Sequence, residues 1–204
     1  MIAPSPLNRI PQAFARAADV LRSPREDARI DISEIPAPSK LAPYAIALGA
    51  EVGADEAFQA ASGEDIEELA TGRIVLLYDP ARPEEWDGQF RLVSYIRAEL
   101  EAEMGNEAML GAVAWSWLTE ALETNDCEIA RAGGTTTRVM SESFGTLAGR
   151  PWTVDLELRA SWTPVVEDPE EIGNHVDAWI DLIGMVAGLP PVAEGVTPLP
   201  GRRR

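Results

Sequence analysis

The chain has 204 residues, 46 % of them hydrophobic and six of them tryptophan, which is enough to build one domain around a sizeable core. Its 34 acidic residues outnumber its 17 lysines and arginines and give a net charge of −17. This balance argues against binding to nucleic acids or to anionic membrane surfaces, because both interactions depend on positive charge. The single cysteine, Cys127, excludes an internal disulfide and any site built from several thiolates.

No stretch approaches the roughly 20 consecutive apolar residues of a membrane helix. The first residues, MIAPSPLNRIPQ, lack the apolar segment of a signal peptide, so we expect a cytoplasmic protein. We expect a flexible N-terminus at 1–8, a single domain at 9–191 and a flexible tail rich in Pro, Gly and Arg at 192–204.

The first half of the chain predicts a helix followed by strands. Residues 10–21 place their apolar side chains on one helical face, and 28–36 and 44–52 alternate as strands do. Residues 62–65 open a helical turn that is expected to end near Gly72. The continuous apolar run 74–78 predicts a central strand that is covered on both faces. A longer alternating strand begins at Phe90 and extends for about nine residues.

The second half predicts two helices and three strands. Residues 107–123 carry an apolar stripe at helical spacing, and the last helix begins at Asp168-Pro169 and stops at Gly188. Gly133-Gly134 separates two extended segments, which is a strong signal for a two-residue β-hairpin turn. With the alternating strand 152–162, these segments predict a three-stranded antiparallel meander. The fold class is therefore α+β: one largely antiparallel sheet of about six or seven strands with amphipathic helices on one face.

The sequence contains no recognisable catalytic constellation. The stretch AGGTTTRVMSESFG lies between strands, so it does not match a phosphate-binding loop, and its serines have no histidine nearby. His175 is the only histidine, which excludes a histidine cluster for a metal, and we interpret it as a packed, hydrogen-bonded residue of the last helix. We therefore predict no catalytic residue, no metal site and no cofactor.

Weak candidates for a binding surface remain. Trp86 lies in a loop, where it either covers the core, the reading we favour, or makes an exposed contact; Trp115 lies at the margin of its helix stripe. Arg138 and Glu142 are four residues apart on a predicted strand, and Arg91 and Arg97 share the polar side of another strand. If these two polar strand faces converge on a cleft, ligand binding is favoured; if they face solvent, the sheet is a scaffold.

Seven strings in order along the chain resemble one family: LAPYAIAL, ATGRIVLLYDP, WDGQFRLVSYIRAELE, WSWLTEALE, GGTTTRVMSESFG, LRASWTP and AWIDLIGMVAGLPP. They are similar to the actinobacterial proteins grouped as the domain of unknown function 3000 family, over about residues 14–191. The resemblance implies an actinobacterial cytoplasmic setting. It implies no activity, cofactor or catalytic residue.

Two hypotheses about function follow. The first is a non-catalytic cytoplasmic interaction or regulatory protein that uses a sheet face or a helix edge to bind an unknown protein partner, its oligomeric state being open. The alternative is a small-ligand-binding protein or an enzyme with carboxylate chemistry, with or without a metal ion. Asp79, Asp87, Glu99 and Glu142 would be its candidate acids.

Overall fold

The computed structural model describes residues 10–53, 68–100, 109–149 and 152–190, so the predicted flexible ends at 1–8 and 192–204 lie outside the described residues. The elements follow one another as α1 (Gln12–Leu21), β1 (Asp31–Ile35), β2 (Tyr44–Gly53), β3 (Glu68–Tyr78), β4 (Phe90–Leu100), α4 (Leu110–Thr124), β5 (Ile129–Ser141), η2 (Gly145–Leu147), β6 (Thr153–Pro164), η3 (Pro169–Glu171) and α5 (Ile172–Val186).

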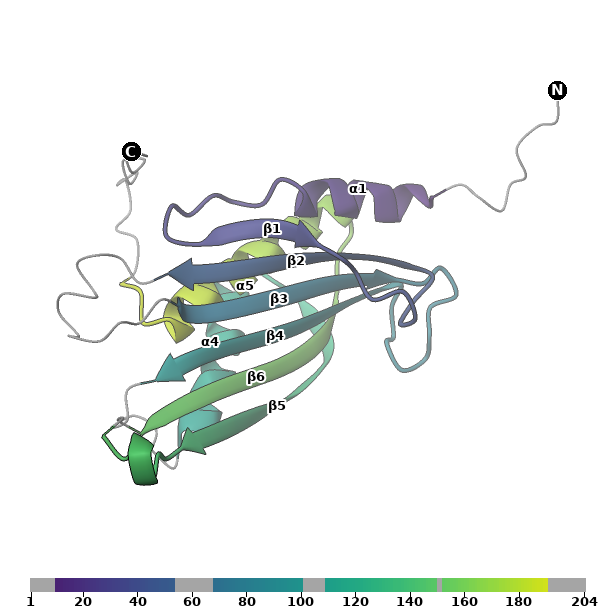
Figure 1. The fold of residues 1–204 in the computed structure, drawn as a ribbon. Coiled ribbons are helices and arrows are strands. Elements are labelled where there is room, and N and C mark those ends of the chain that lie inside the picture. The colour runs from purple at the N-terminus through teal and green to yellow at the C-terminus, as the bar shows by residue number, and fades with distance from the viewer. Residues whose placement is uncertain (1–9, 54–67, 101–108, 150–151, 191–204) are drawn as a thin grey trace.

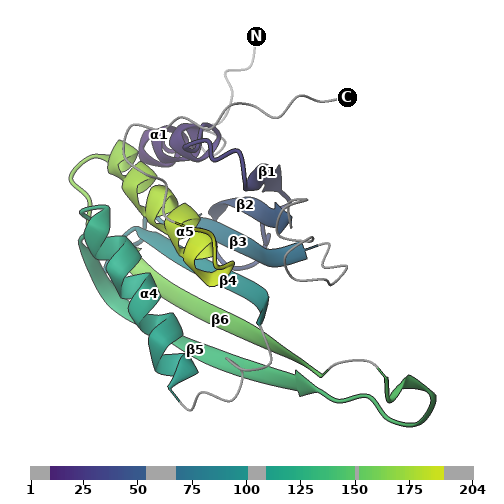
Figure 2. The ribbon, with the colours of Figure 1, turned by 90° about the vertical axis from the view of Figure 1, so that its left-hand side faces the viewer.

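The strands of the described residues form one six-stranded antiparallel sheet in the order β1-β2-β3-β4-β6-β5. The three α-helices of the described residues lie on one face of this sheet, with α5 between α1 and α4 (Figures 1 and 2). The expectation of a single α+β domain with an antiparallel sheet and helices on one face is confirmed. The first and last strands of the order, β1 and β5, are the two edges of the sheet.

Alternate residues of the strands point toward the helices and are buried in the core. In β4 the even-numbered residues are buried, and in β6 Leu156, Leu158 and Trp162 are almost fully buried on the same face. Leu92 is paired with Trp162, so inward positions meet across strands and form a continuous apolar surface under the helices. The period-two pattern of the sequence thus predicted the buried face correctly.

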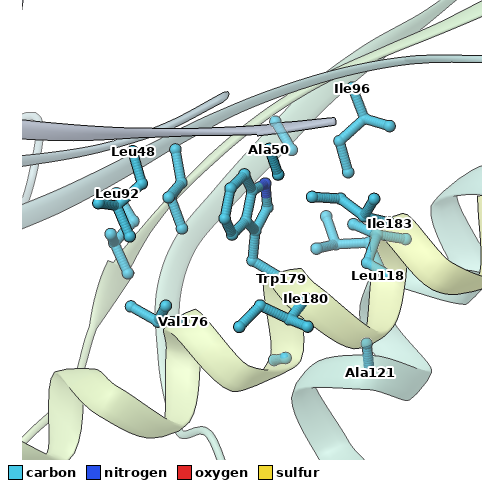
Figure 3. Close-up of a cluster of buried hydrophobic side chains, with 14 of the residues drawn as sticks. Leu48, Ala50, Leu92, Ile96, Leu118, Ala121, Val176, Trp179, Ile180 and Ile183 are labelled. Carbon is cyan, nitrogen blue, oxygen red and sulfur yellow. The ribbon is translucent and has the colours of Figure 1, made fainter. Parts of the chain in front are cut away.

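Helix α5 is the centre of the core (Figure 3). The side chain of Trp179 is 1 % exposed and points from α5 toward the sheet, with Val176, Ile180 and Ile183 beside it on the same helix. Gly72 on β3 allows this close approach, because a Cβ there would come within 2.6 Å of Ile183 and 3.1 Å of the Trp179 ring.

The predicted start of the last helix is confirmed in detail. Asp168 accepts the backbone N–H of Glu170, and the Glu171 carboxylate accepts the backbone N–H of Asp168, so the two side chains form a capping box. Arg16 of α1 donates to Asp168 and Glu170, each at 2.9 Å. This ion pair joins the first helix to the turn that precedes the last.

The other face of the sheet is covered only in part. Ala47, Val75 and Leu77 form a second, small buried cluster, against which the partly buried Trp86 and Val93 pack. The central strand predicted at 74–78 is therefore buried on both faces, as expected. Trp86 covers apolar side chains, in agreement with the reading of this residue as a cap.

Two local predictions are wrong. Gly133 and Gly134 do not form a hairpin turn: β5 runs without interruption from Ile129 to Ser141, with a bulge between Ala130 and Gly133. The predicted three-stranded meander is consequently a single hairpin of β5 and β6, and β6 pairs with β4 on its other side. The predicted helical turn at 62–72 lies largely outside the described residues, and its last residues belong to β3, which begins at Glu68.

The physical reason for the first error lies on α4. A Cβ at Gly134 would come within 2.7 Å of the Trp115 ring and 2.4 Å of the Arg159 carbonyl oxygen. Glycine at this position makes room for a tryptophan from another element, and neither Gly133 nor Gly134 has a positive φ. The glycine pair therefore reflects tertiary packing and not the left-handed backbone of a turn.

Candidate functional site

His175 is buried, with 1 % of its surface exposed, and receives a hydrogen bond at its Nδ1 from the indole Nε1–H of Trp162 at 3.3 Å. Indole nitrogen is only a donor, so Nδ1 must carry the lone pair and a neutral ring must hold its proton on Nε2. Burial lowers the pKa of His175 to about 4, so the ring is neutral at physiological pH.

This geometry limits what His175 can do. With Nδ1 engaged by Trp162 and Nε2 protonated, neither nitrogen offers a lone pair to a metal ion or to a substrate proton. The ring lines a hollow of about 390 Å³ together with Asn174 and four carboxylates, those of Asp126, Glu128, Glu167 and Glu171. Among the described residues no group of three or more His, Cys, Asp or Glu side chains is arranged to hold a metal ion.

Cys127 is half-buried and lies between α4 and β5, where its Sγ is 3.6 Å from the carbonyl oxygen of Asn125. Burial, with smaller contributions from Asp126 and Asp177, raises the pKa of the thiol to about 12. Very little thiolate is therefore present at neutral pH, so Cys127 is poorly suited to act as a nucleophile.

Arg91 has its hydrogen bonds inside the protein. Its guanidinium donates to the Arg131 carbonyl at 2.9 Å, to Thr163 Oγ1 at 3.1 Å and to Ser161 Oγ at 2.6 Å. Arg131 lies in the bulge of β5 with a φ of 50°, and its carbonyl oxygen accepts the hydrogen bond from Arg91. Burial lowers the pKa of Arg91. The side chain therefore fastens β4 to the bulge and to β6.

The remaining candidates lie on opposite faces of the sheet. Arg97 is on the face away from the helices and pairs with Asp155 at 2.9 Å. Arg138 is paired with Leu156, whose side chain is in the core, so Arg138 is on the helix side. Glu142 follows the end of β5. The two polar strand faces do not converge on one cleft, and the binding roles of these residues stay predictions.

Trp115 is half-buried and packs on β5 over Gly134. Its position fixes α4 against the edge strand.

A shallow hollow lies on the face of the sheet away from the helices. It has a volume of about 400 Å³ and is lined around Gly49 by polar side chains of β1, β2, β3 and β4, among them Asp31, Glu51, Arg73 and Tyr95. Beside it, the Arg159 guanidinium lies over the Tyr95 ring at 5.4 Å from its centroid. Arg73 lines this hollow, and its exposed side chain makes no hydrogen bond or ion pair with the described residues.

Among the described residues, exposed apolar side chains are concentrated on the end of β5 and the turn that follows it. We call residues 134–149 the arm; all of them except Thr136 and Ser143 are exposed. Of the eight exposed large hydrophobic side chains in the described residues, four are in the arm: Val139, Met140, Phe144 and Leu147. Phe144 is 75 % exposed and Met140 is 54 % exposed. Figure 2 shows β5 and β6 extending to a turn that lies well away from the helices.

Sequence reasoning missed the exposed side chains of the arm. The segment FGTLAG places Phe144 and Leu147 among turn-forming residues, and this is the signal that could have identified them. An apolar residue near glycines usually packs beneath its turn, however, and only the tertiary structure shows that no described element covers these two.

The fold and the geometry define a single α+β domain with helices on one face of an antiparallel sheet and a projecting hairpin. The chain belongs to the family described as "Protein of unknown function (DUF3000)", whose model matches residues 10–197. No curated protein and no solved structure matches the chain. Among the described residues no helix is long and apolar enough to cross a membrane.

Proposed function

We propose that this protein is a non-catalytic cytoplasmic interaction or regulatory protein that binds a protein partner through the arm. The observation that carries the proposal is the concentration of exposed apolar side chains on residues 139–147. Exposed apolar side chains that gather on one segment are typical of a protein-binding surface. Arg91 and His175 make hydrogen bonds inside the protein, and the raised pKa of Cys127 keeps its thiol protonated. These features support a structural role for the three side chains.

A site-specific cross-linking experiment tests the proposal. A photoreactive phenylalanine analogue replaces Phe144, and a matched control places the analogue at Lys40, an exposed residue between β1 and β2. We expect one partner to cross-link in stoichiometric amount at position 144 and not at position 40. The substitution Met140→Ser should weaken this cross-link because it removes apolar surface from the arm. Identical products from both positions would refute the proposal.

The hollow around Gly49 favours a second candidate function, the binding of a small polar ligand. The hollow combines the guanidinium of Arg73 with the carboxylates of Asp31 and Glu51, a set that suits a zwitterionic molecule such as an amino acid. A thermal-shift panel of amino acids and small carboxylates tests this candidate against the variant Arg73→Gln. Stabilisation that is absent in the variant supports the candidate, and no stabilisation by any compound contradicts it.

A further inference from the structure

The hollow in front of His175 lies where the end of α4, the start of β5 and the segment between β6 and α5 meet. Figure 2 shows the end of α4 beside the start of α5. We call this hollow of about 390 Å³ the acidic hollow, because its lining includes four carboxylates beside His175, those of Asp126, Glu128, Glu167 and Glu171. Among the described residues no lysine or arginine lines it, so these carboxylates face the hollow without a counter-charge.

Three of the four carboxylates are free to meet a ligand. The Glu171 carboxylate accepts the backbone N–H groups of Glu167 and Asp168 and belongs to the capping box of the last helix. The exposed side chains of Asp126, Glu128 and Glu167 make no hydrogen bond or ion pair with the described residues. A cation that enters the acidic hollow is therefore attracted by several carboxylates at once and does not have to break an ion pair first.

His175 adds an unused hydrogen-bond donor to the acidic hollow. The residue is 1 % exposed, and its Nδ1 accepts the indole N–H of the buried Trp162, which leaves the proton on Nε2. The two nitrogens of an imidazole point in diverging directions, so Nε2–H is directed away from Trp162 and toward the hollow that the ring lines. It has no acceptor among the described residues. Because buried donors normally have an acceptor, this N–H indicates one that a ligand supplies.

The carboxylates and the N–H donor select different parts of one ligand. Carboxylates attract a positive charge, whereas an N–H donor needs an oxygen or nitrogen lone pair. The four carboxylates oppose a negatively charged acceptor, so the acceptor must be neutral. A metal ion does not match either, because Nε2 carries a proton and the described residues hold no group of ligating side chains arranged for one. An organic ammonium ion with a neutral oxygen close to its charge satisfies both features.

We propose that the acidic hollow binds the amino end of a peptide. The α-ammonium group meets the carboxylates of Asp126, Glu128 and Glu167, and the first carbonyl oxygen accepts the Nε2–H of His175. These two groups of a peptide are separated by a single carbon atom, so one small hollow can receive both. The site is independent of the arm, because it adjoins the start of β5 and the arm is at the end of that strand.

The single histidine of the chain reports binding directly, because imidazole carbon–proton NMR signals can come only from His175. Glycinamide, the smallest mimic of a peptide amino end, should shift these signals in a saturable way at pH 7. Isobutylamine has a similar size and charge without the carbonyl oxygen, and it should bind about tenfold more weakly. Propionamide keeps the carbonyl and lacks the charge, and it should also bind about tenfold more weakly. Triglycine amide should bind at least as tightly as glycinamide, because only the first carbonyl is needed in the hollow.

Two double variants separate binding in the acidic hollow from general attraction to an acidic protein. Glu128→Gln with Glu167→Gln removes two carboxylates of the hollow and should weaken glycinamide binding about tenfold. The matched control is Glu99→Gln with Glu142→Gln, which removes the same charge from exposed residues. Glu99 is paired with Asp155 near the start of β6 and Glu142 follows β5, whereas the hollow adjoins the end of β6. The control should remain within about twofold of the original protein.

Four results would contradict the proposal. Equal affinity for glycinamide and isobutylamine would exclude the hydrogen bond from His175, and equal weakening by both double variants would exclude the acidic hollow as the site. Weaker binding of triglycine amide than of glycinamide would exclude a peptide as the ligand. No shift of the His175 signals with glycinamide would overturn the proposal as a whole. None of these measurements involves the arm, so a failure here is distinct from a failure of the proposed function.

Discussion

His175 should make the stability of this protein sensitive to pH well above the range where most proteins respond to acid. The ring is buried in the core and accepts a hydrogen bond from Trp162, and burial lowers its pKa to about 4 from an ordinary value of 6.5. Protonation is therefore favoured in the unfolded chain. The contribution of the neutral ring is fully present above pH 6.5 and declines as the pH falls from 6.5 toward 4.

The size of the effect follows from the two pKa values. At pH 5 nearly all of the unfolded chains carry a protonated His175, whereas about a tenth of the folded molecules do. The free energy of unfolding should therefore fall by about 2 kcal/mol between pH 7.5 and pH 5 through this residue alone. A loss of this size is a large fraction of the stability of an ordinary domain.

Urea denaturation at pH 7.5 and pH 5, followed by tryptophan fluorescence, measures the effect. The matched variant is His175→Gln, since the glutamine amide oxygen can accept the Trp162 N–H and does not titrate. The original protein should lose about 2 kcal/mol more than the variant over this interval. All other titrating groups are common to both proteins, so their contributions cancel in the difference.

A direct titration gives an independent check that does not depend on the variant folding. His175 is the only histidine, so its imidazole signal in a carbon–proton NMR spectrum needs no assignment. The signal should not titrate near pH 6.5 while the protein is folded. A midpoint close to 6.5, or an equal pH-dependent loss of stability in the original protein and the glutamine variant, would refute the reasoning.

Three further predictions concern packing and reactivity. Gly134→Ala should destabilise the protein by about 2 kcal/mol or more, because the added Cβ would overlap the Trp115 ring and the Arg159 carbonyl oxygen. The control Gly133→Ala, whose Cβ would meet nothing within 4 Å, should change stability by less than about 0.5 kcal/mol. Equal losses of stability for the two variants in urea denaturation would favour a turn at these glycines. Ser94→Ala should be neutral or stabilising by up to about 1 kcal/mol, because its buried hydroxyl has no hydrogen-bond partner in the described residues; a clear loss of stability would contradict this. Cys127 should react with a disulfide reagent at pH 8 at least a hundredfold more slowly than a free thiol in the folded state, and at an ordinary rate in urea.

Much of the fold could be predicted from local patterns. The alternation in β4 and β6 identified the buried face of both strands, and the signals at Asp168 and Pro169 located the start of the last helix. These predictions succeed because residues at a fixed spacing share one face of a strand or helix. When that face is buried, apolar residues recur in the sequence at the same spacing.

The error at Gly133-Gly134 has the opposite origin. Glycine is needed both where φ is positive and where another group approaches the backbone closely, and the sequence does not distinguish these two needs. Trp115 is the group that approaches, and it reaches Gly134 only because α4 packs across β5. A local hairpin rule therefore gave a turn where tertiary packing required a strand.

The candidate site divides in the same way. The sequence by itself determined the charge, the class of fold and the buried faces of the strands, because these depend on composition and on periods within single elements. Only the tertiary structure decided that Arg91 donates hydrogen bonds to its neighbours and that Arg97 and Arg138 lie on opposite faces of the sheet. It also decided that no described element covers the apolar side chains of the arm. Each of these facts depends on which elements meet in space. A contact between distant segments produces no regular spacing of residue types in either segment, so the sequence alone does not reveal it.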